Sequence, residues 1–218
     1  MKILLIDTCG EVGSVALADS DADVSSVISA ELPGRSASER LVATVRGLAA
    51  QAGWEFATVG AIAVVNGPGS FTGVRVGVSA AKGLAEALTV PVVAISRLAV
   101  MAELGGGGRV LAVLDAGRGE FYCGFYDGQR HERELLLTRS EVAAAAEGKR
   151  LIACEPRVAE ALADLGPEQV KAPVAADALG IALRRIAAAE FDDVTTLDAN
   201  YLRRTDAEIF AKHAAARA

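Results

Sequence analysis

The chain has 218 residues, 52% of them hydrophobic, and a formal net charge of −6 at pH 7. This length and hydrophobic content indicate a compact protein of one domain or two small lobes and argue against a disordered chain. Basic residues are scattered, some as short pairs, and no broad positive surface of the kind found in nucleic-acid-binding proteins is visible. Charges interrupt every apolar stretch, and no leader sequence is visible, so we expect a cytoplasmic protein without a membrane segment.

Before residue 105 the hydrophobic pattern predicts alternating strands and helices. Short apolar runs between turn residues indicate strands, and apolar residues spaced three or four positions apart indicate helices. The predicted elements are a hairpin of residues 3–8 and 14–18, a strand at 24–32, a helix at 36–52, a strand at 61–65, a helix at 71–88 and a strand at 90–95. Ser36 and Glu39 form a capping box for the first of these helices.

Four consecutive glycines at 105–108 cannot hold a regular element and predict a boundary between two lobes, 1–104 and 105–218. After them we expect strands at 110–114, 121–126 and 133–137 and a helix at 157–165. Aspartates flank the first and second hairpins at the same separation, which suggests an internal duplication. They are Asp7, Asp19, Asp115 and Asp127.

The most informative segment is NGPGSFTGVRVGVSAAKGLAEAL, residues 66–88, which joins a strand to a helix. Its helix-opening loop contains Gly67, Gly69, Ser70, Thr72 and Gly73. Ser70 or Thr72 is placed to cap the helix, and the first N–H groups beside a glycine-rich turn favour an anion or a close backbone contact. No Gly-Lys-Ser or Gly-Lys-Thr follows, which argues against a P-loop NTPase.

The 71–88 helix has three distinct faces. One carries small side chains (Gly73, Gly77, Ala80, Gly83, Leu84 and Ala87), one is apolar (Val74, Val78, Ala81 and Ala85), and one is polar (Arg75, Ser79, Lys82 and Glu86). One surface is expected to cover the sheet of its own lobe. The other can meet a second helix of this chain or of a partner, and internal packing alone explains the glycines about as well.

The string GPGSFTGVRVGVSAAKGLA closely resembles the signature of the TsaB (YeaZ) family, bacterial proteins needed to make threonylcarbamoyladenosine in tRNA. Agreement with that family extends over most of the chain. It includes KILLIDT, GSVALAD, LAVLDAGRGEFYCGFYD and residues 198–203. The resemblance implies a two-lobed α/β fold of the actin-like ATPase type, a duplicated RNase H-like fold with mixed sheets flanked by helices.

The resemblance further implies a non-catalytic scaffold subunit. TsaB-like proteins pair with the catalytic subunit TsaD, which transfers threonylcarbamoyl to the adenosine beside the anticodon, and the ATPase TsaE joins them. Alone, such a protein is expected to form a homodimer, and to contact tRNA only indirectly. The implied partner interface uses the first-lobe helices. Here it comprises Leu41, Val45, Leu48, Arg75, Val76, Ser79, Ala80, Gly83 and Ala87.

An actin-like fold holds a nucleotide between its lobes, and this chain keeps only vestiges of that site. The candidates are Asp7, Thr8, Asp115 and Gly117, but Glu11 places an acid near the expected phosphate position. The third nucleotide-binding turn corresponds to residues 152–156, which contain no glycine. We therefore expect weak or absent ATP binding and no cofactor. The alternative is an ATPase or phosphotransferase that uses Asp7 and Asp115 around magnesium.

No catalytic or metal-binding cluster is visible. The two histidines, His131 and His213, are far apart and are expected to be exposed structural residues. Cys9, Cys123 and Cys154 are expected to be buried or half-buried free thiols in a reducing compartment. A third reading, a homodimeric interaction module outside tRNA modification, leaves the family signature unexplained.

Overall fold

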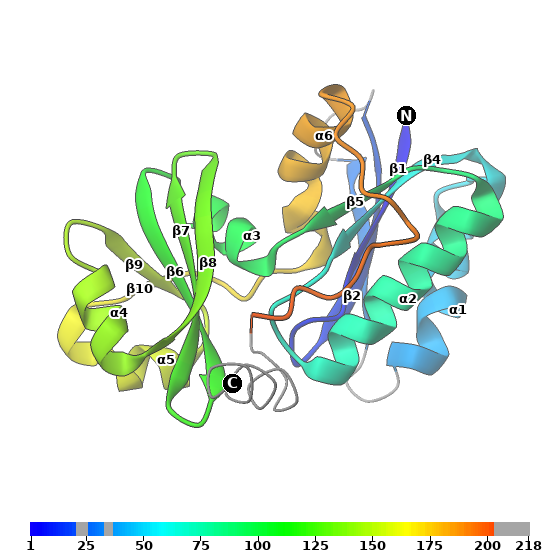
Figure 1. The fold of residues 1–218 in the computed structure, drawn as a ribbon. Helices are drawn as coiled ribbons and strands as arrows, with labels where there is room; N and C mark the ends of the chain where they lie inside the picture. Colours follow the sequence, from blue (N-terminus) through cyan, green and yellow to red (C-terminus); the bar gives the residue numbers. More distant parts are fainter. Residues whose placement is uncertain (21–25, 33–36, 203–218) are drawn as a thin grey trace, which may run out of the picture.

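A computed structural model of the protein describes residues 1–20, 26–32 and 37–202. In these ranges the chain forms two five-stranded sheets, each flanked by helices, and Figure 1 shows them as two lobes side by side. None of the helices described is long and apolar enough to cross a membrane.

The first sheet has the strand order β3-β2-β1-β4-β5. Its strands are β1 (Lys2–Asp7), β2 (Gly13–Asp19), β3 (Ile28–Leu32), β4 (Val59–Val65) and β5 (Val92–Ile95). β1 pairs antiparallel with β2 and parallel with β4, so β1 is central and buried on both faces. The helices α1 (Ala37–Gln51) and α2 (Phe71–Leu88) cover one face, and α6 (Leu179–Ala187) covers the other (Figure 1).

The second sheet has the strand order β10-β9-β6-β7-β8. Its strands are β6 (Arg109–Gly117), β7 (Glu120–Asp127), β8 (Arg130–Thr138), β9 (Arg150–Ala153) and β10 (Glu168–Gln169). One face packs on α4 (Arg139–Ala145) and α5 (Pro156–Ala161) around Phe125 and Val142. The other face packs on α3 (Arg97–Leu104) around Leu98 and Met101.

Both sheets share one topology. Read from β8, the second sheet runs third, second, first, fourth and fifth strand of its lobe, as the first sheet does from β3. In each lobe the first two strands form an antiparallel hairpin, and the fourth lies parallel to the first. The predicted two-lobed α/β fold with mixed sheets, and the duplication suggested by the flanking aspartates, are confirmed.

Most predicted elements are present, although several of their bounds differ from the prediction. The helix expected at 157–165 is divided into α5 and the short 3-10 helix Ala163–Leu165, with Leu162 outside helical geometry between them. Strand β8 starts at Arg130, three residues earlier than expected. Ser36 of the expected capping box, residues 24 and 25 of the expected third strand, and His213 lie outside the described residues.

The division of the chain into 1–104 and 105–218 is wrong for residues 175–199. A 3-10 helix at Ala175–Ala178, helix α6 and residues up to 199 return to the first lobe. Six of their side chains are buried in the first core: Ala175, Ala178, Leu179, Ala182, Leu197 and Ala199. The first lobe is thus built from both ends of the described chain, which the glycine run could not reveal.

Candidate functional site

The helix-opening loop packs tightly against the turn after β1. Ser70 caps α2 by accepting a hydrogen bond from the Gly73 amide, and its own amide donates to the Cys9 carbonyl over 2.8 Å. In return, the Thr8 hydroxyl donates to the Gly73 carbonyl over 2.6 Å. Of the two possibilities for this loop, an anion or a close backbone contact, the structure has the close contact.

The glycines around this contact have a steric reason. A Cβ atom at Gly69 would overlap the Cys9 carbonyl, and one at Gly73 would overlap the carbonyl oxygen of Thr8. At Gly77 a Cβ would overlap the Thr8 hydroxyl. Internal packing therefore explains the first half of the small-residue face of α2. Gly83 differs, because a Cβ there meets no atom within 4 Å.

A cleft of about 1310 Å³ lies between the lobes and brings the two hairpin turns together. Its lining includes Thr8, Asp115 and Gly117, three of the four vestigial nucleotide-site candidates. Residues 154–157 and the start of α2 line it as well. The sequence thus predicted correctly which turns meet, and their chemistry decides whether a nucleotide fits there.

Asp7, the fourth candidate, lies beneath the first turn rather than at its surface. Only 2% of it is exposed, and its Oδ1 accepts the Cys9 amide over 2.8 Å. Burial raises the pKa of its carboxyl, while the nearby Arg97 guanidinium opposes that rise. Arg97 is itself buried and donates from Nη1 to the Cys9 carbonyl over 3.3 Å. Arg97 therefore supports the turn after β1 from inside the protein. The sequence analysis did not identify this role.

The second turn is occupied by a network of charged side chains. Asp115 accepts the Gly117 amide on Oδ1 and pairs with Arg157 through Oδ2, at 3.2 Å. The Asp115 amide donates to the Glu155 carboxylate over 2.8 Å. The Glu155 carboxylate thus already accepts the Asp115 amide, a backbone donor that a bound phosphate would need. The negative charge of Glu155 also repels a phosphate. No group of three or more potential metal ligands exists among the described residues.

The histidine and the cysteines of the described chain offer no catalytic arrangement. His131 is exposed on β8, its ring 5.5 Å from that of Tyr126. Cys9 and Cys123 are buried and Cys154 is partly buried, and all three are free thiols, as predicted. Burial raises the pKa of Cys123 to about 12 and also raises that of Cys154, so neither thiol is activated as a nucleophile.

The expected partner interface needs a correction on α1. Leu41, Val45 and Leu48 are at most 5% exposed and form part of the core beneath that helix. They are therefore not available as surface contacts in this structure. The periodicity placed them correctly on one apolar face, but that face covers the sheet. Val42 on the same helix is 48% exposed.

The α2 residues of the expected interface form a surface strip. We call Val76, Ser79, Ala80, Gly83 and Ala87 the α2 ridge. Ser79, Gly83 and Ala87 are exposed, and Val76 and Ala80 are partly exposed. The apolar face of Val74, Val78, Ala81 and Ala85 is buried against the sheet. The ridge consists of small side chains except for Val76, so another backbone can approach it closely.

The segment 195–201 runs along one flank of α2 (Figure 1). Lys82 donates to the Leu197 carbonyl over 2.9 Å, and Arg75 Nε donates to the Tyr201 hydroxyl over 2.6 Å. The Asn200 amide donates to the Asn66 carbonyl over 2.7 Å. The helix-opening loop, the α2 flank and this segment are therefore one connected unit. Residues 66–88 and 198–203 both agree with the family, yet no pattern in the sequence predicted that they are in contact.

Glu134 on β8 joins this unit to the second lobe. Its carboxylate accepts hydrogen bonds from Ser96 Oγ and the Tyr126 hydroxyl, both at 2.5 Å, and from Asn200 Nδ2 at 2.6 Å. The three donors come from the start of α3, from β7 and from the returning segment. Burial raises the pKa of Tyr126, and Glu134 adds to this rise. One carboxylate thus links both lobes.

Comparison with known proteins finds relatives that are named for a tRNA modification. Residues 28–139 match the family model described as TsaD, tRNA N6-adenosine threonylcarbamoyltransferase. The tRNA threonylcarbamoyladenosine biosynthesis protein TsaB of Escherichia coli is 39% identical over 139 residues, which cover 62% of this chain and 58% of that protein. TsaB of Bacillus subtilis is 35% identical over 147 residues, 66% and 63% of the two chains. The matches thus span less than two thirds of these curated relatives.

Solved structures agree over a longer part of the chain. A Pseudomonas aeruginosa protein described as similar to peptidase YEAZ superposes with a TM-score of 0.79 at 31% identity, covering 93% of this chain and 99% of that one. The ethanolamine utilization protein EutJ of Carboxydothermus hydrogenoformans, at 13% identity and a TM-score of 0.52, shares the fold alone, over 84% and 90% of the chains. These neighbours confirm the actin-like fold. By its signature, its fold and these similarities, the chain belongs to the TsaB (YeaZ) family.

Proposed function

We propose that this protein is a non-catalytic scaffold subunit in the synthesis of threonylcarbamoyladenosine in tRNA. In this proposal it binds a TsaD-type catalytic subunit through the first-lobe helices, and a TsaE-type ATPase joins the pair. Without the catalytic subunit it forms a homodimer through the same surface. It contacts tRNA only indirectly, through its partners.

The observation that carries the proposal is the exposed α2 ridge. Val76 and Ala80 pack partly against the first core, whereas Ser79, Gly83 and Ala87 are exposed small residues that allow a second helix to approach closely. Gly83 is the clearest case, because an alanine there has open space and a better helix propensity. Val42 is also exposed and adds apolar surface on the neighbouring helix α1.

The chemistry of the cleft supports a non-catalytic role. Asp7 is buried, and Asp115 is paired with Arg157 while Glu155 holds its amide. An ATPase or phosphotransferase of this fold needs both aspartates to face magnesium and phosphate. Their present partners oppose that use, so the enzyme alternative has less support than the scaffold.

A titration with the TsaD-type protein of the same organism, followed by mass measurement in solution, tests the proposal. A one-to-one complex that replaces a homodimer is the expected result. Absence of a complex at micromolar concentrations, with TsaE-type ATPase and nucleotide added, would overturn it. Micromolar ATP binding that is lost in Asp7→Ala would favour the enzyme instead.

Two substitutions test the surface. Gly83→Lys places a long charged side chain on the ridge without meeting atoms of its own lobe, and should abolish the complex. Ala144→Lys makes the same kind of change at an exposed position on α4 in the second lobe and should leave the affinity unchanged. Equal affinity of both variants would refute this position of the interface.

A further inference from the structure

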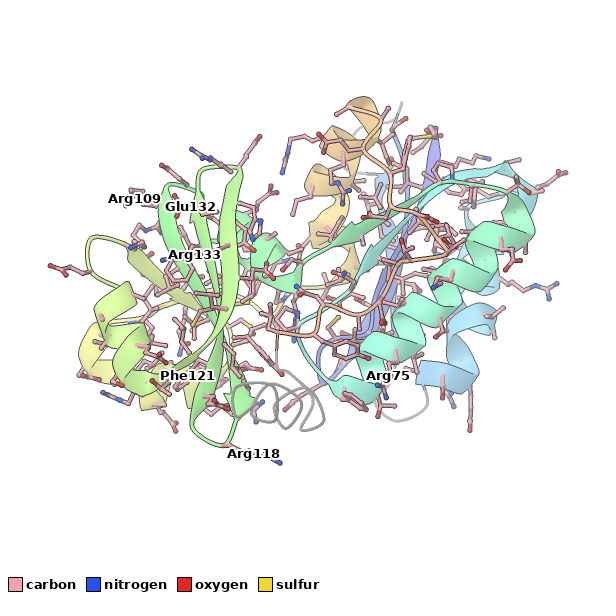
Figure 2. All side chains as sticks on the ribbon, viewed as in Figure 1. Arg75, Arg109, Arg118, Phe121, Glu132 and Arg133 are labelled. Carbon is pink, nitrogen blue, oxygen red and sulfur yellow. The ribbon has the colours of Figure 1, made fainter. Side chains whose placement is uncertain are left out.

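Three side chains form an exposed cluster at the first turn of α2. The guanidinium carbon of Arg75 lies 3.6 Å from the centroid of the Phe71 ring and 5.6 Å from that of Tyr201. Arg75 Nε donates to the Tyr201 hydroxyl over 2.6 Å, and the two rings are 6.1 Å apart. We call Phe71, Arg75 and Tyr201 the Arg75 cluster. Figure 2 shows Arg75 near the lower, N-terminal end of α2.

The cluster is exposed although its composition suits burial. Phe71 is 60% exposed and Tyr201 is 45% exposed, the two largest values for aromatic side chains in the described chain. Both rings belong to types that are enriched at the centres of protein interfaces, as is arginine. The core gains little from rings placed there, so their position is better explained by a contact outside this chain.

Arg75 is held in one orientation by its neighbours. The Phe71 ring fixes the plane of the guanidinium by stacking, and the Tyr201 hydroxyl fixes its direction through Nε. Among the residues that the structure describes, stacking and the Nε bond leave the edge formed by the two Nη atoms for another acceptor. That edge is the fork that binds a carboxylate through two parallel hydrogen bonds. Because the side chain is already ordered, less entropy is lost on binding.

The surrounding charges indicate the sign of the partner. Arginines Arg40, Arg46 and Arg75 and the lysine Lys82 lie on α1 and α2, against the acids Glu39 and Glu86 on their surfaces. These two helices are therefore net positive, although the whole chain carries −6. A partner face with acidic side chains complements them.

We propose that the Arg75 cluster is an anchor for a carboxylate side chain on the TsaD-type partner, at the edge of the α2 ridge. Arg75 lies on the polar flank of α2, one helical position from the ridge residue Val76. The ridge provides close approach between helices, and the anchor fixes the register of the partner along α2. This inference rests on the proposed function and adds a residue and a chemistry to it.

The test measures the affinity of the full-length chain for the TsaD-type subunit at low and high salt. Arg75→Ala should weaken binding about 30-fold or more, as expected for an arginine that forms a hot spot of an interface. Arg75→Lys keeps the charge but loses the fork, and should recover only a small part of that loss. Tyr201→Phe keeps the ring but frees the guanidinium, and should weaken binding about threefold to tenfold.

Arg109→Ala is the matched control, since Arg109 is an exposed arginine at the far end of the second lobe (Figure 2). It should leave the affinity unchanged. Circular dichroism and thermal unfolding of each variant show whether the fold is kept. The salt dependence of binding should be smaller for Arg75→Ala than for the unmodified chain, because one ion pair is lost.

The outcomes separate this inference from the proposed function. If the unmodified chain binds the TsaD-type subunit and Arg75→Ala binds equally well, the anchor is refuted and the scaffold stands. The anchor is likewise refuted if Arg75→Lys keeps full affinity, or if Arg75→Ala changes only self-association or only binding of tRNA to the assembled complex. If the unmodified chain forms no complex, the proposed function fails and the anchor fails with it.

Discussion

Two glycines of α2 predict opposite effects of the same substitution. Gly73→Ala places a Cβ atom on the carbonyl oxygen of Thr8, a backbone atom that cannot rotate away. Gly83→Ala places it in open space on the same helix. Both changes gain about 1 kcal/mol of helix propensity. Only Gly73→Ala also incurs overpacking, which costs typically about 1–3 kcal/mol and more when backbone must shift.

The free energy of unfolding should therefore rise by about 0.5–1 kcal/mol for Gly83→Ala. For Gly73→Ala the net change should be a loss of about 2 kcal/mol or more, since backbone displacement places the overpacking cost at or above the top of its range and the gain in helix propensity offsets only about 1 kcal/mol. The same shift of the backbone in Gly73→Ala should weaken the hydrogen bond that the Thr8 hydroxyl donates to the carbonyl of residue 73.

Urea unfolding followed by circular dichroism gives both values, and equal slopes show that the same surface is exposed on unfolding. A Gly73→Ala protein as stable as the unmodified chain would refute the steric argument. A loss of stability in Gly83→Ala would show that the ridge is packed within the single chain.

Two further predictions concern the carboxylates of Asp7 and Glu134. Because the pKa of Asp7 is raised in the folded state, the folded protein binds this proton more tightly than the unfolded chain does. The contribution of Asp7 to stability is therefore present below the pKa of the unfolded chain and is lost as the pH rises through the raised pKa. Asp7→Asn should remove this part of the pH dependence in urea unfolding between acid and neutral pH, and an unchanged profile would contradict the assignment. Glu134→Gln replaces one acceptor oxygen of a three-donor carboxylate by an amide donor and should destabilise the protein by about 1–3 kcal/mol. Amide hydrogen exchange of residues 198–202 should become faster in Glu134→Gln. It should not change in the control Glu132→Gln, which alters an exposed residue of β8. Equal exchange rates in both variants would refute the role of Glu134 in linking the lobes.

The sequence predicted the elements well because their signals are local. Strand β1 is a continuous apolar run, and α2 has a clear three-faced pattern between a serine cap and a left-handed Thr89. The duplicated hairpins were visible from four aspartates. By contrast, the place of residues 175–199 depends on contacts with strands more than 80 positions earlier, which no local pattern encodes.

The candidate site was predicted in part for the same reason. The turns at Asp7 and Asp115 were expected to meet, and Thr8 and Asp115 do line one cleft. The pairing of Asp115 with Arg157, the buried Arg97 and the contact of Phe71, Arg75 and Tyr201 are tertiary facts. The prediction that Leu41, Val45 and Leu48 belong to the partner interface was wrong. An apolar helix face in the sequence does not indicate whether it packs on its own sheet or on a partner.

Because residues 175–199 return to the first lobe, the two lobes complete their cores in a defined order during synthesis of the chain. While the ribosome is still making the second lobe, strands β1, β2, β4 and β5 have already emerged but lack the side chains that close the far face of their sheet. The second lobe, from β6 to β10, is continuous in sequence and can complete its core first. The lobe with the exposed helices is thus the last to close, and its nascent form exposes apolar strands for as long as about 80 residues take to be added.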